Sequence, residues 1–325
     1  MVAINANQST FAEAKVQQIL FTKKFPFTFG FICFDLKKRI LFIINPISGG
    51  KKKEQFPRLI SECLHPEKFR YEVVFTEYAG HAKLLAEEAV LKRTDIVAAV
   101  GGDGTINEVA SAVEGSQSAL AIIPFGSGNG LARFLQISLD NRKALRSLNR
   151  LNIEAIDTGL LNGRKFFNMA GVGFDAHISA VFAALNTRGF IGYVKTTLKE
   201  IASYKSQLYL INIDGISIER RAFMLSIANS SQFGNNAHVS PKASARDGLL
   251  DVCIIKPFPL YHFPVMVYHM FSKTADKSKY VEIVRGKNIY IKREGKDAVH
   301  LDGEPEEMQS ELKIEVKPLS LAVVI

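Results

Sequence analysis

Three apolar segments in the first half of this sequence each run directly into a glycine-rich turn. The segment ILFII is followed by NPISGG, IVAAV by GGDGT, and AIIP by FGSGNG. These apolar runs have the length of buried strands. Glycine carries no Cβ, so the backbone N–H groups of such turns can approach a ligand closely. A chain of this kind must therefore fold so that bare backbone turns follow three buried strands.

Strands and helices are expected to alternate along the chain up to about residue 152. The apolar pattern predicts strands at 40–44, 71–76, 96–100 and 120–123, and helices at 56–64, 82–89 and 105–113. Such alternation is typical of a parallel sheet with helices on both faces. Ligands of these sheets bind outside the carboxyl ends of the strands, so we expect the three turns to lie side by side at one edge.

After about residue 152 the pattern changes to short segments of alternating polar and apolar residues. Examples are AIDTGLL, QLYLINID, LLDVCIIK, NIYIKRE and ELKIEVK, and helices are expected chiefly at 193–203 and 261–271. Asn162 and Gly163 lie between two such segments and predict a tight hairpin. The second half is therefore expected to be a mostly antiparallel β-sandwich or a flattened barrel.

These changes predict two domains behind an N-terminal extension. Residues 1–38 are an aromatic and basic extension of unknown order, 39–152 a nucleotide-binding α/β domain, and 153–319 a β-rich domain. The last apolar residues, 320–325, are expected to be a strand that returns to the first domain. With 325 residues, the chain is long enough for each domain to bury a core.

Composition excludes several classes of protein. The chain is 47% hydrophobic and 22% charged, as globular proteins are, and no apolar stretch reaches the ~20 residues that span a bilayer. Its three cysteines form no CxxC pair, which indicates a reducing cytoplasm. The net charge of +9 suits a polyphosphate or an anionic membrane surface. Nucleic acid is not an expected partner, because the sequence has no RNA- or DNA-binding signature.

Asp103 in the GGDGT turn points to the chemistry of the three turns. A carboxylate among phosphate-binding glycines repels phosphate unless a cation lies between them, and Mg²⁺ is held in this way by carboxylates and substrate phosphates. Alternatively, Asp103 orients an attacking hydroxyl. Both interpretations indicate phosphoryl transfer. The sequence has no Walker-type pattern, and GVGFDA at 171–176 is interpreted as a packing turn rather than a dinucleotide site.

GGDGTINEV, with NPISGG before it and PFGSGNGLAR after it, resembles the diacylglycerol kinase catalytic-domain family, which includes bacterial diacylglycerol kinases, sphingosine kinases and ceramide kinases. FTEYAGHA, DTGLLNGRKFFNMAGVGFDA, ARDGLLDV and LDGE match the family in chain order. The resemblance extends from Arg39 to the C-terminus. It implies an α/β domain of NAD kinase/diacylglycerol kinase-like fold, a β-sandwich domain, and ATP bound with Mg²⁺ between them.

The resemblance assigns the nucleotide site residue by residue. Its ATP-binding positions fall on the three glycine turns and on the end of the second strand. They are Asn45, Pro46, Ser48, Gly49, Thr76, Gly101, Gly102, Asp103, Gly104, Thr105, Asn107 and Ser127. A structural Mg²⁺ site of the bacterial members corresponds to Ser244, Asp247 and Leu249, the last through its carbonyl oxygen.

The same resemblance implies the catalytic carboxylates. Glu304 in LDGE is expected to be the base that deprotonates the lipid hydroxyl, and Asp302 is expected to support metal or substrate. In the sphingosine kinases the position of Asp103 is credited with the base instead, so both assignments stay open. Asn129 is followed by Gly130 where many diacylglycerol kinases carry aspartate, and this form is closer to the sphingosine kinases.

We therefore expect an ATP- and Mg²⁺-dependent lipid kinase that phosphorylates diacylglycerol or a sphingoid base. Its substrate lies in a membrane, so the enzyme is expected in the cytoplasm, peripheral at the inner face of the membrane, with a homodimer left open. Two alternatives remain. NAD kinases share GGDGT on a related fold and use a soluble substrate, and a catalytically silent protein would bind only nucleotide or membrane. The GSGNGLAR turn and the INEV continuation favour the lipid kinase.

Overall fold

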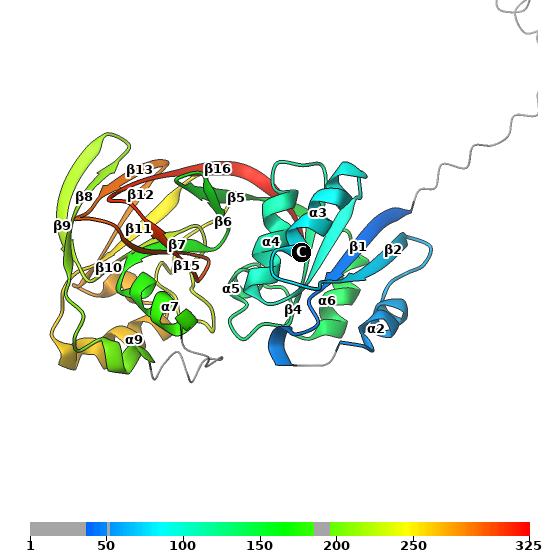
Figure 1. Cartoon of the computed structure of the whole chain (residues 1–325), viewed down its shortest axis with the longest axis horizontal. Helices are drawn as coiled ribbons and strands as arrows, with labels where there is room; N and C mark the ends of the chain where they lie inside the picture. Colours follow the sequence, from blue (N-terminus) through cyan, green and yellow to red (C-terminus); the bar gives the residue numbers. More distant parts are fainter. Residues whose placement is uncertain (1–36, 51–52, 185–195) are drawn as a thin grey trace, which may run out of the picture. The chain divides into compact units, whose positions relative to one another are not determined.

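The computed structural model describes residues 37–50, 53–184 and 196–325, which belong to one unit that runs from Lys37 to Ile325 (Figure 1). The expected N-terminal extension at 1–38 lies almost entirely outside the described residues. So does the first part of the helix expected at 193–203, of which residues 196–200 are described and helical.

A parallel sheet forms the first half of this unit. Its strands are β1 (Lys38–Ile44), β2 (Phe69–Phe75), β3 (Ile96–Gly101) and β4 (Ala119–Pro124), in the order β2-β1-β3-β4. β3 and β4 are buried along their whole length because helices cover both faces of the sheet. The glycine turns follow β1, β3 and β4 at the carboxyl edge, as the sequence predicted.

Helices pack on both faces of the parallel sheet. They are η1 (Ser48–Gly50), α2 (Phe56–Cys63), α3 (His81–Leu91), α4 (Asp103–Val113), α5 (Gly130–Phe134) and α6 (Asn141–Leu148). α3 and α4 pack with Ile43 and Val97 on one face, whereas α2 and α6 pack with Phe42 and Ala98 on the other. Neighbouring residues of one strand thus contact opposite helix layers, as the alternation of side chains along a strand requires.

The second half is built from two antiparallel layers. Its elements are β5 (Ile153–Leu161), β6 (Arg164–Phe166), β7 (Met169–Gly173), α7 (Phe174–Ala184), β8 (Gln207–Ile213), β9 (Ile216–Ala222), β10 (Met224–Ala228), β11 (Leu250–Ile255), η2 (Leu260–His262), α9 (Phe263–Phe271), η3 (Ala275–Lys277), β12 (Val281–Gly286), β13 (Asn288–Lys292), β14 (Asp297–Leu301), β15 (Glu304–Met308) and β16 (Glu311–Val324). One layer contains β5, β6, β8, β9, β13 and β16, and the other has the order β12-β11-β10-β7-β14-β15. Apolar side chains such as Tyr209, Val172 and Val252 fill the space between the layers.

β16 joins the two halves of the unit. It pairs with β13 and β5 in the sandwich, changes register between Lys317 and Leu321, and then lies parallel to β4, with Val323 opposite Leu120. Figure 1 shows β16 as the red strand that passes from the sandwich to the first sheet. The parallel sheet and one layer of the sandwich are therefore one continuous sheet of ten strands.

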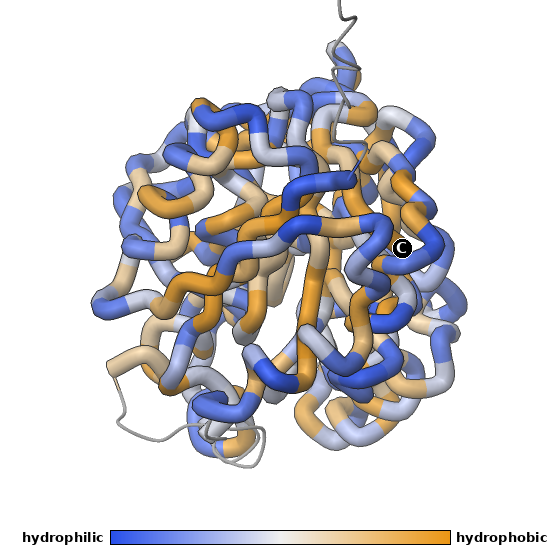
Figure 2. The backbone as a smooth tube through the Cα atoms, turned by 90° about the vertical axis from the view of Figure 1, so that its right-hand side faces the viewer, coloured by the Kyte–Doolittle hydropathy of each residue, from blue (hydrophilic) through white to orange (hydrophobic). Residues whose placement is uncertain are grey.

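α7 and α9 lie on the outer face of the β12-β11-β10-β7-β14-β15 layer. Phe174 and Ile178 of α7 and Met266 of α9 pack with Met224 and Ile255 of that layer. In Figure 2 the apolar stretches, drawn in orange, run through strands in the middle of the view. Among the described residues, no helix is long and apolar enough to cross a membrane.

The predicted architecture, a helix-covered parallel sheet followed by a mostly antiparallel sandwich, is confirmed. The hairpin at Asn162-Gly163 is confirmed as well, since both residues have positive φ and link β5 to β6. The interpretation of GVGFDA as a packing turn is correct for the packing, since a Cβ at Gly171 or Gly173 would clash, but wrong for the turn: both glycines belong to β7, and α7 begins at Phe174. This strand turns directly into a helix although its neighbours are antiparallel, a combination that the sequence pattern did not reveal. The exact domain boundaries stay a prediction.

Gly159 in β5 lies opposite Phe166 in β6, and a Cβ at position 159 would lie 2.0 Å from the phenyl ring. We expect Gly159→Ala to lower the free energy of unfolding by about 1–3 kcal/mol, because the buried ring cannot move to admit a methyl group. Chemical denaturation measures the change. In a double-mutant cycle, Phe166→Leu should reduce the loss caused by the alanine. Strictly additive losses would show that the ring is not what excludes a side chain.

Candidate active site

The turns after β1, β3 and β4 contact one another at the edge of the parallel sheet. The side-chain amide of Asn45 donates to Thr105 Oγ1 (3.0 Å), and the backbone N–H of Phe125 donates to the carbonyl of Gly101 (2.7 Å). Gly49 has a φ of 66°, and a Cβ there would lie 1.8 Å from the Phe125 carbonyl oxygen. Because only glycine allows this approach, the three turns form one continuous backbone surface.

Asp103 is the first residue of α4 and fastens the turn after β3 to the turn after β4. Its two carboxylate oxygens accept hydrogen bonds from the backbone N–H groups of Asn129 (2.8 Å) and Gly130 (2.9 Å). Burial raises the pKa of the Asp103 carboxyl, and these hydrogen bonds act in the opposite direction. A Cβ at Gly128 would lie 2.9 Å from the carboxylate, so the turn closes tightly around it. Asp103 therefore holds two of the glycine turns together.

Packing explains why glycine, and not aspartate, follows Asn129 in this chain. Asn129 has a φ of 50°, and its side chain accepts from the N–H of Gly126 and donates to the carbonyl of the same residue. A Cβ at Gly130 would lie 2.8 Å from Asn168 Nδ2 and 2.9 Å from the carbonyl oxygen of Phe233. An aspartate at position 130 would therefore require both neighbours to move.

Lys53 also belongs to this region, although no motif in the sequence points to it. Its ammonium group donates to the carbonyl oxygens of Asn45 (2.7 Å) and Ser48 (2.6 Å), and it lies 4.7 Å from the centre of the Phe125 ring. The residue is 3% exposed, and burial lowers the pKa of Lys53 to about 8. Lys53 thus fixes the turn after β1. Its place in a run of three lysines gave no signal, because such runs usually mark a solvated surface.

Asp302, from the LDGE segment, joins the sandwich to α4. Its carboxylate accepts hydrogen bonds from the backbone N–H groups of Phe167 (2.9 Å), Asn168 (2.8 Å) and Met169 (2.9 Å), and from Asn107 Nδ2 (2.6 Å). Burial raises the pKa of the Asp302 carboxyl, and the four hydrogen bonds oppose this change. A carboxylate has about four lone-pair sites, and all are used here. The arrangement favours a positioning role for Asp302 over direct contact with metal or substrate.

Glu304 is the carboxylate of LDGE that is free to react. It begins β15, is exposed, and has no side-chain hydrogen bond or ion pair among the residues that the structure describes. A Cβ at Gly104 would lie 3.4 Å from Glu304 Oε1. The carboxylate therefore faces the first turn of α4, where the GGDGT backbone is bare.

A buried pair of polar side chains lies next to LDGE. His300 Nε2 is 3.1 Å from Asp175 Oδ2, and Ser226 Oγ donates to the same oxygen (2.9 Å). The backbone N–H of Gly303 donates to His300 Nδ1 (3.3 Å), so the ring carries its proton on Nε2 and donates it to Asp175. A Cβ at Gly171 would lie 2.3 Å from Asp175 and 2.4 Å from His300. The first glycine of GVGFDA thus makes room for a pair that holds Gly303.

A cavity of about 520 Å³ lies between the outer face of the sandwich and its two helices. Its wall is mostly apolar and includes Phe174, Ile178, Phe223, Phe263, Met266 and Met270. Polar groups line it where it meets LDGE and the turn after β4, namely Ser127, Asn168, Asp175, His300 and Asp302. Its size lies within the usual range of small-molecule sites. The cavity is therefore suited to a long apolar ligand with a polar end near Glu304.

The remaining nucleotide-site predictions lie on the same edge of the sheet. Thr76 directly follows β2, and its backbone N–H donates to the carbonyl of Ile44 (2.9 Å). Pro46 and Ser127 are exposed, whereas Asn107 is engaged by Asp302. The structure thus brings the predicted residues together, and their contact with a nucleotide stays a prediction.

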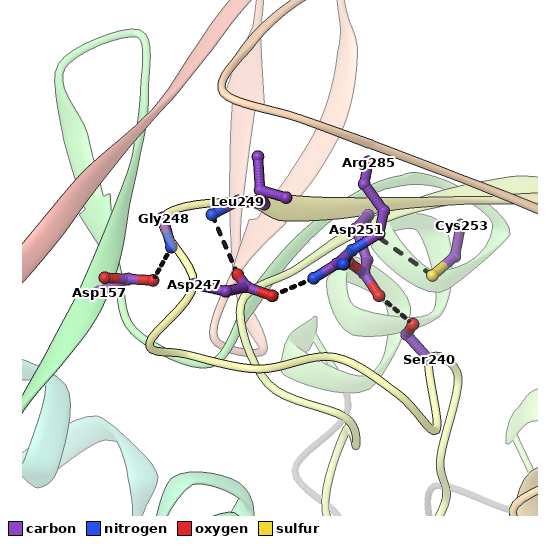
Figure 3. Close-up of polar contacts among 8 residues, drawn as sticks. All are labelled: Asp157, Ser240, Asp247, Gly248, Leu249, Asp251, Cys253 and Arg285. Atoms are coloured by element: carbon purple, nitrogen blue, oxygen red, sulfur yellow. Dashed lines mark hydrogen bonds and ion pairs between the residues drawn. The ribbon is translucent and has the colours of Figure 1, made fainter.

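The segment predicted to hold a structural Mg²⁺ has its charge balanced by an arginine. Asp247 forms an ion pair with Arg285, whose Nε also donates to Asp251 (2.9 Å), as Figure 3 shows. The second oxygen of Asp247 accepts from the N–H of Leu249 (3.1 Å). Within the described ranges, no group of three or more His, Cys, Asp or Glu side chains could hold a metal ion. These contacts do not favour a cation at Ser244, Asp247 and Leu249.

Two family models match consecutive parts of the chain. Residues 39–161 match the diacylglycerol kinase catalytic domain, and residues 168–325 match the YegS C-terminal NAD kinase beta sandwich-like domain. The diacylglycerol kinase of Bacillus subtilis (strain 168) is 28% identical over 275 residues, which cover 82% of this chain and 90% of that protein. A protein of Pseudomonas aeruginosa (strain UCBPP-PA14) named "Probable lipid kinase YegS-like" is 31% identical over 250 residues, which cover 75% of this chain and 81% of that protein.

Solved structures share the fold. The crystal structure of a diacylglycerol kinase from Bacillus anthracis str. Sterne matches with a TM-score of 0.68 and 19% identity, covering 88% of this chain and 96% of that one. An NAD kinase from Archaeoglobus fulgidus in complex with ATP matches with a TM-score of 0.50 and 15% identity, covering 88% and 93%. At these identities the likeness confirms the predicted fold class and nothing more. The two family models and the 31% identical relative show that the chain belongs to the diacylglycerol kinase catalytic-domain family of lipid kinases.

Proposed function

We propose that this protein transfers the γ-phosphate of ATP to the hydroxyl group of a membrane lipid, either diacylglycerol or a sphingoid base. The observation that carries the proposal is the position of Glu304. Its free carboxylate faces Gly104 at the start of α4, and it follows directly on Asp302 and Gly303, which line the polar end of the apolar cavity. A hydroxyl held at that end would lie between a general base and the glycine turns.

The glycine turns support a nucleotide at the edge of the parallel sheet. Gly102 and Gly104 leave the backbone on either side of Asp103 accessible at the start of α4, and a helix N-terminus favours the negative charge of a phosphate. Lys53 brings a positive charge to the turn after β1, which is the turn that contacts Thr105 through Asn45. We infer that the phosphates lie against 101–104, and that Thr76 and the turn after β1 contact the rest of the nucleotide.

The cavity supports a lipid as the acceptor. Its wall on α7 and α9 offers aromatic and thioether side chains, which suit a hydrocarbon chain that leaves water. The polar groups gather at one end, next to Glu304, where a hydroxyl would have to lie. The soluble substrate of an NAD kinase-like enzyme would need polar partners that most of this wall does not provide.

The chemical step assigns separate tasks to the carboxylates. Glu304 accepts the proton of the lipid hydroxyl while the hydroxyl oxygen forms a bond with the γ-phosphorus of ATP. The bond between the γ-phosphorus and the oxygen that bridges it to the β-phosphorus breaks, so that ADP leaves. Asp103 and Asp302 hold the turns and the LDGE segment in place. Mg²⁺, when bound with the ATP phosphates, would neutralise their charge, and the Asp103 carboxylate retains free lone pairs for it on this edge.

A substrate panel tests the proposal directly. The purified protein with labelled ATP and Mg²⁺ is expected to phosphorylate a lipid among diacylglycerol, ceramide and sphingosine, and to leave NAD unchanged. Thin-layer chromatography of the lipid extract and assay of the aqueous phase measure both outcomes. Transfer to NAD alone would establish the NAD kinase-like alternative. If the protein transfers phosphate to none of these acceptors, yet unfolds in one cooperative transition and is therefore folded, it is a catalytically silent relative.

Replacing the two competing bases distinguishes their roles. We expect Glu304→Gln to lower kcat about 10²- to 10⁴-fold with no change in thermal stability, because it removes a general base that has no structural partner. Asp103→Asn places an amide N–H against a backbone donor, so it should lower the free energy of unfolding by about 1–3 kcal/mol and raise KM for ATP. Steady-state kinetics and thermal unfolding of both variants give the comparison. If Glu304→Gln keeps full activity, the role of general base is assigned to Asp103 instead.

Lys53 predicts a pH dependence of ATP binding. Burial lowers its pKa to about 8, so the folded protein loses this charge as the pH rises through 8, whereas the unfolded chain keeps it until about 10.5. Between these values the unfolded state binds more protons, so this group increases stability as the pH rises. ATP affinity should instead fall between pH 7 and pH 9, because the turn after β1 loses its positive charge. Calorimetric titration should show this fall in the wild type and a smaller one in Lys53→Met; equal falls in both would exclude Lys53 as the cause.

A further inference from the structure

α9 is apolar around its whole circumference. In its sequence FPVMVYHMF, the imidazole of His269 and the hydroxyl of Tyr268 are the polar side-chain groups. Phe263, Met266 and Met270 line the cavity, and Met266 is buried against the sandwich. A surface helix normally carries polar residues on the side that faces away from the core. The opposite side of α9 therefore needs an explanation that packing within the described chain does not provide.

The opposite side of α9 is exposed to solvent together with the η2 turn before it. Tyr261 is 77% exposed and Tyr268 is 67% exposed, and Leu260 and Val265 are exposed beside them in the sequence. None of these four residues lines the cavity. Clustered exposed apolar side chains on one element mark an interaction surface, whereas single ones do not.

The apolar surface continues to the mouth of the cavity. Phe271 at the end of α9 and Leu198 both line the cavity, and both are exposed. A residue that does both lies where the cavity opens to the outside. The exposed side of α9 and the opening of the cavity are therefore parts of one apolar surface.

Three lysines follow α9 directly. Lys273, Lys277 and Lys279 are exposed, and none has an ion-pair partner among the described residues. The segment lies against the η2 turn, because the Lys279 ammonium is 5.1 Å from the centre of the Tyr280 ring and that ring contacts His262, with the ring centres 5.2 Å apart. The segment's one acidic residue from 272 to 280, Asp276, is already paired with a lysine outside it. The segment therefore carries uncompensated positive charge next to the apolar surface.

We propose that Leu260, Tyr261, Val265, Tyr268 and Phe271, with Lys273, Lys277 and Lys279, form a docking face that lies on an anionic lipid bilayer. Apolar and aromatic side chains on a helix enter the region between headgroups and acyl chains, and lysines beside them are attracted to anionic headgroups. The cavity would then open into the membrane, so a lipid could enter it without crossing water. This inference rests on the proposed lipid kinase function.

The charge of the face favours a bilayer over a second copy of the chain. In a twofold dimer the same surface patch lies on both sides of the interface, so the three lysines of each copy would lie close to those of the other. An anionic membrane instead complements every lysine. We therefore assign the docking face to the membrane, and test the dimer as an alternative outcome.

Vesicle binding of the full chain tests the docking face. The probes are vesicles of phosphatidylcholine with and without phosphatidylserine, and binding is measured by co-sedimentation. Lys273→Gln/Lys277→Gln/Lys279→Gln should lower the partition coefficient on anionic vesicles about 100-fold, since each lysine near an anionic surface strengthens binding about fivefold. Tyr261→Ser/Tyr268→Ser should lower binding to anionic vesicles about tenfold or more.

Matched variants elsewhere on the sandwich provide the controls. Lys287→Gln/Lys292→Gln/Lys313→Gln removes the same charge from exposed positions on β13, β16 and the turn before β13, and Leu208→Ser/Ile216→Ser removes exposed apolar side chains from β8 and β9. Both should bind vesicles as the wild type does. Equal loss of binding in the controls, or unchanged binding in the docking-face variants, would overturn the proposal. The proposal would also be overturned if light scattering gave a lower molar mass for Tyr261→Ser/Tyr268→Ser than for the wild type, because this would identify the face as a dimer interface.

Activity on dispersed substrate separates this inference from the proposed function. All four variants should phosphorylate a short-chain lipid in detergent micelles at the wild-type rate, because the altered residues do not line the cavity. If the wild-type protein phosphorylates no lipid, the proposed lipid kinase function is refuted. Membrane binding is then judged from the vesicle experiment alone. An active wild type whose docking-face variants bind vesicles normally would refute the docking face alone.

Discussion

Four hydrogen bonds to the carboxylate of Asp302 hold the LDGE segment of the sandwich against α4 of the parallel domain. One donor, Asn107, comes from α4 of the parallel domain, and the other three are backbone N–H groups of the two residues between β6 and β7 and of the first residue of β7. A buried carboxylate without such donors would be strongly destabilising, so the two halves must present them in register. Glu304 follows two residues later, and its direction toward Gly104 depends on this anchor. The base, the glycine turns and the polar end of the cavity thus share one point of attachment.

Much of the fold could be predicted because its signals are local. The run IVAAV, the glycines after it and the amphipathic residues from Thr105 on each indicate their own structure within a few positions, and the same holds for the Asn162-Gly163 hairpin. The path of β16 could not be predicted in detail. Its alternating apolar residues look the same whether they face β5 in the sandwich or β4 in the parallel sheet, and the change occurs inside one strand. Pairing partners that are distant in the sequence leave no trace in periodicity.

The same distinction between local and long-range signals applies to the candidate active site. The glycine turns indicated phosphate chemistry from the residues alone, whereas the roles of Glu304 and Asp302 came from the family resemblance. The pair of Asp175 and His300 joins residues from different strands and helices, and no spacing in the sequence connects them. Asp103 shows the limit most clearly. Its presence among glycines suggested a cation or a hydroxyl, yet in the structure its oxygens accept backbone N–H groups from the turn after β4.

The path of β16 also determines the order in which the chain can be assembled. β4 receives its second neighbour from β16, which the ribosome makes only after the other strands of the sandwich, so this edge of the parallel sheet stays unpaired during most of translation. At about 5–20 residues per second, that interval lasts on the order of tens of seconds. Unpaired strand edges are templates for pairing with other chains. Sharing one sheet between two halves thus exposes the newly made protein to aggregation until its last strand has closed the edge.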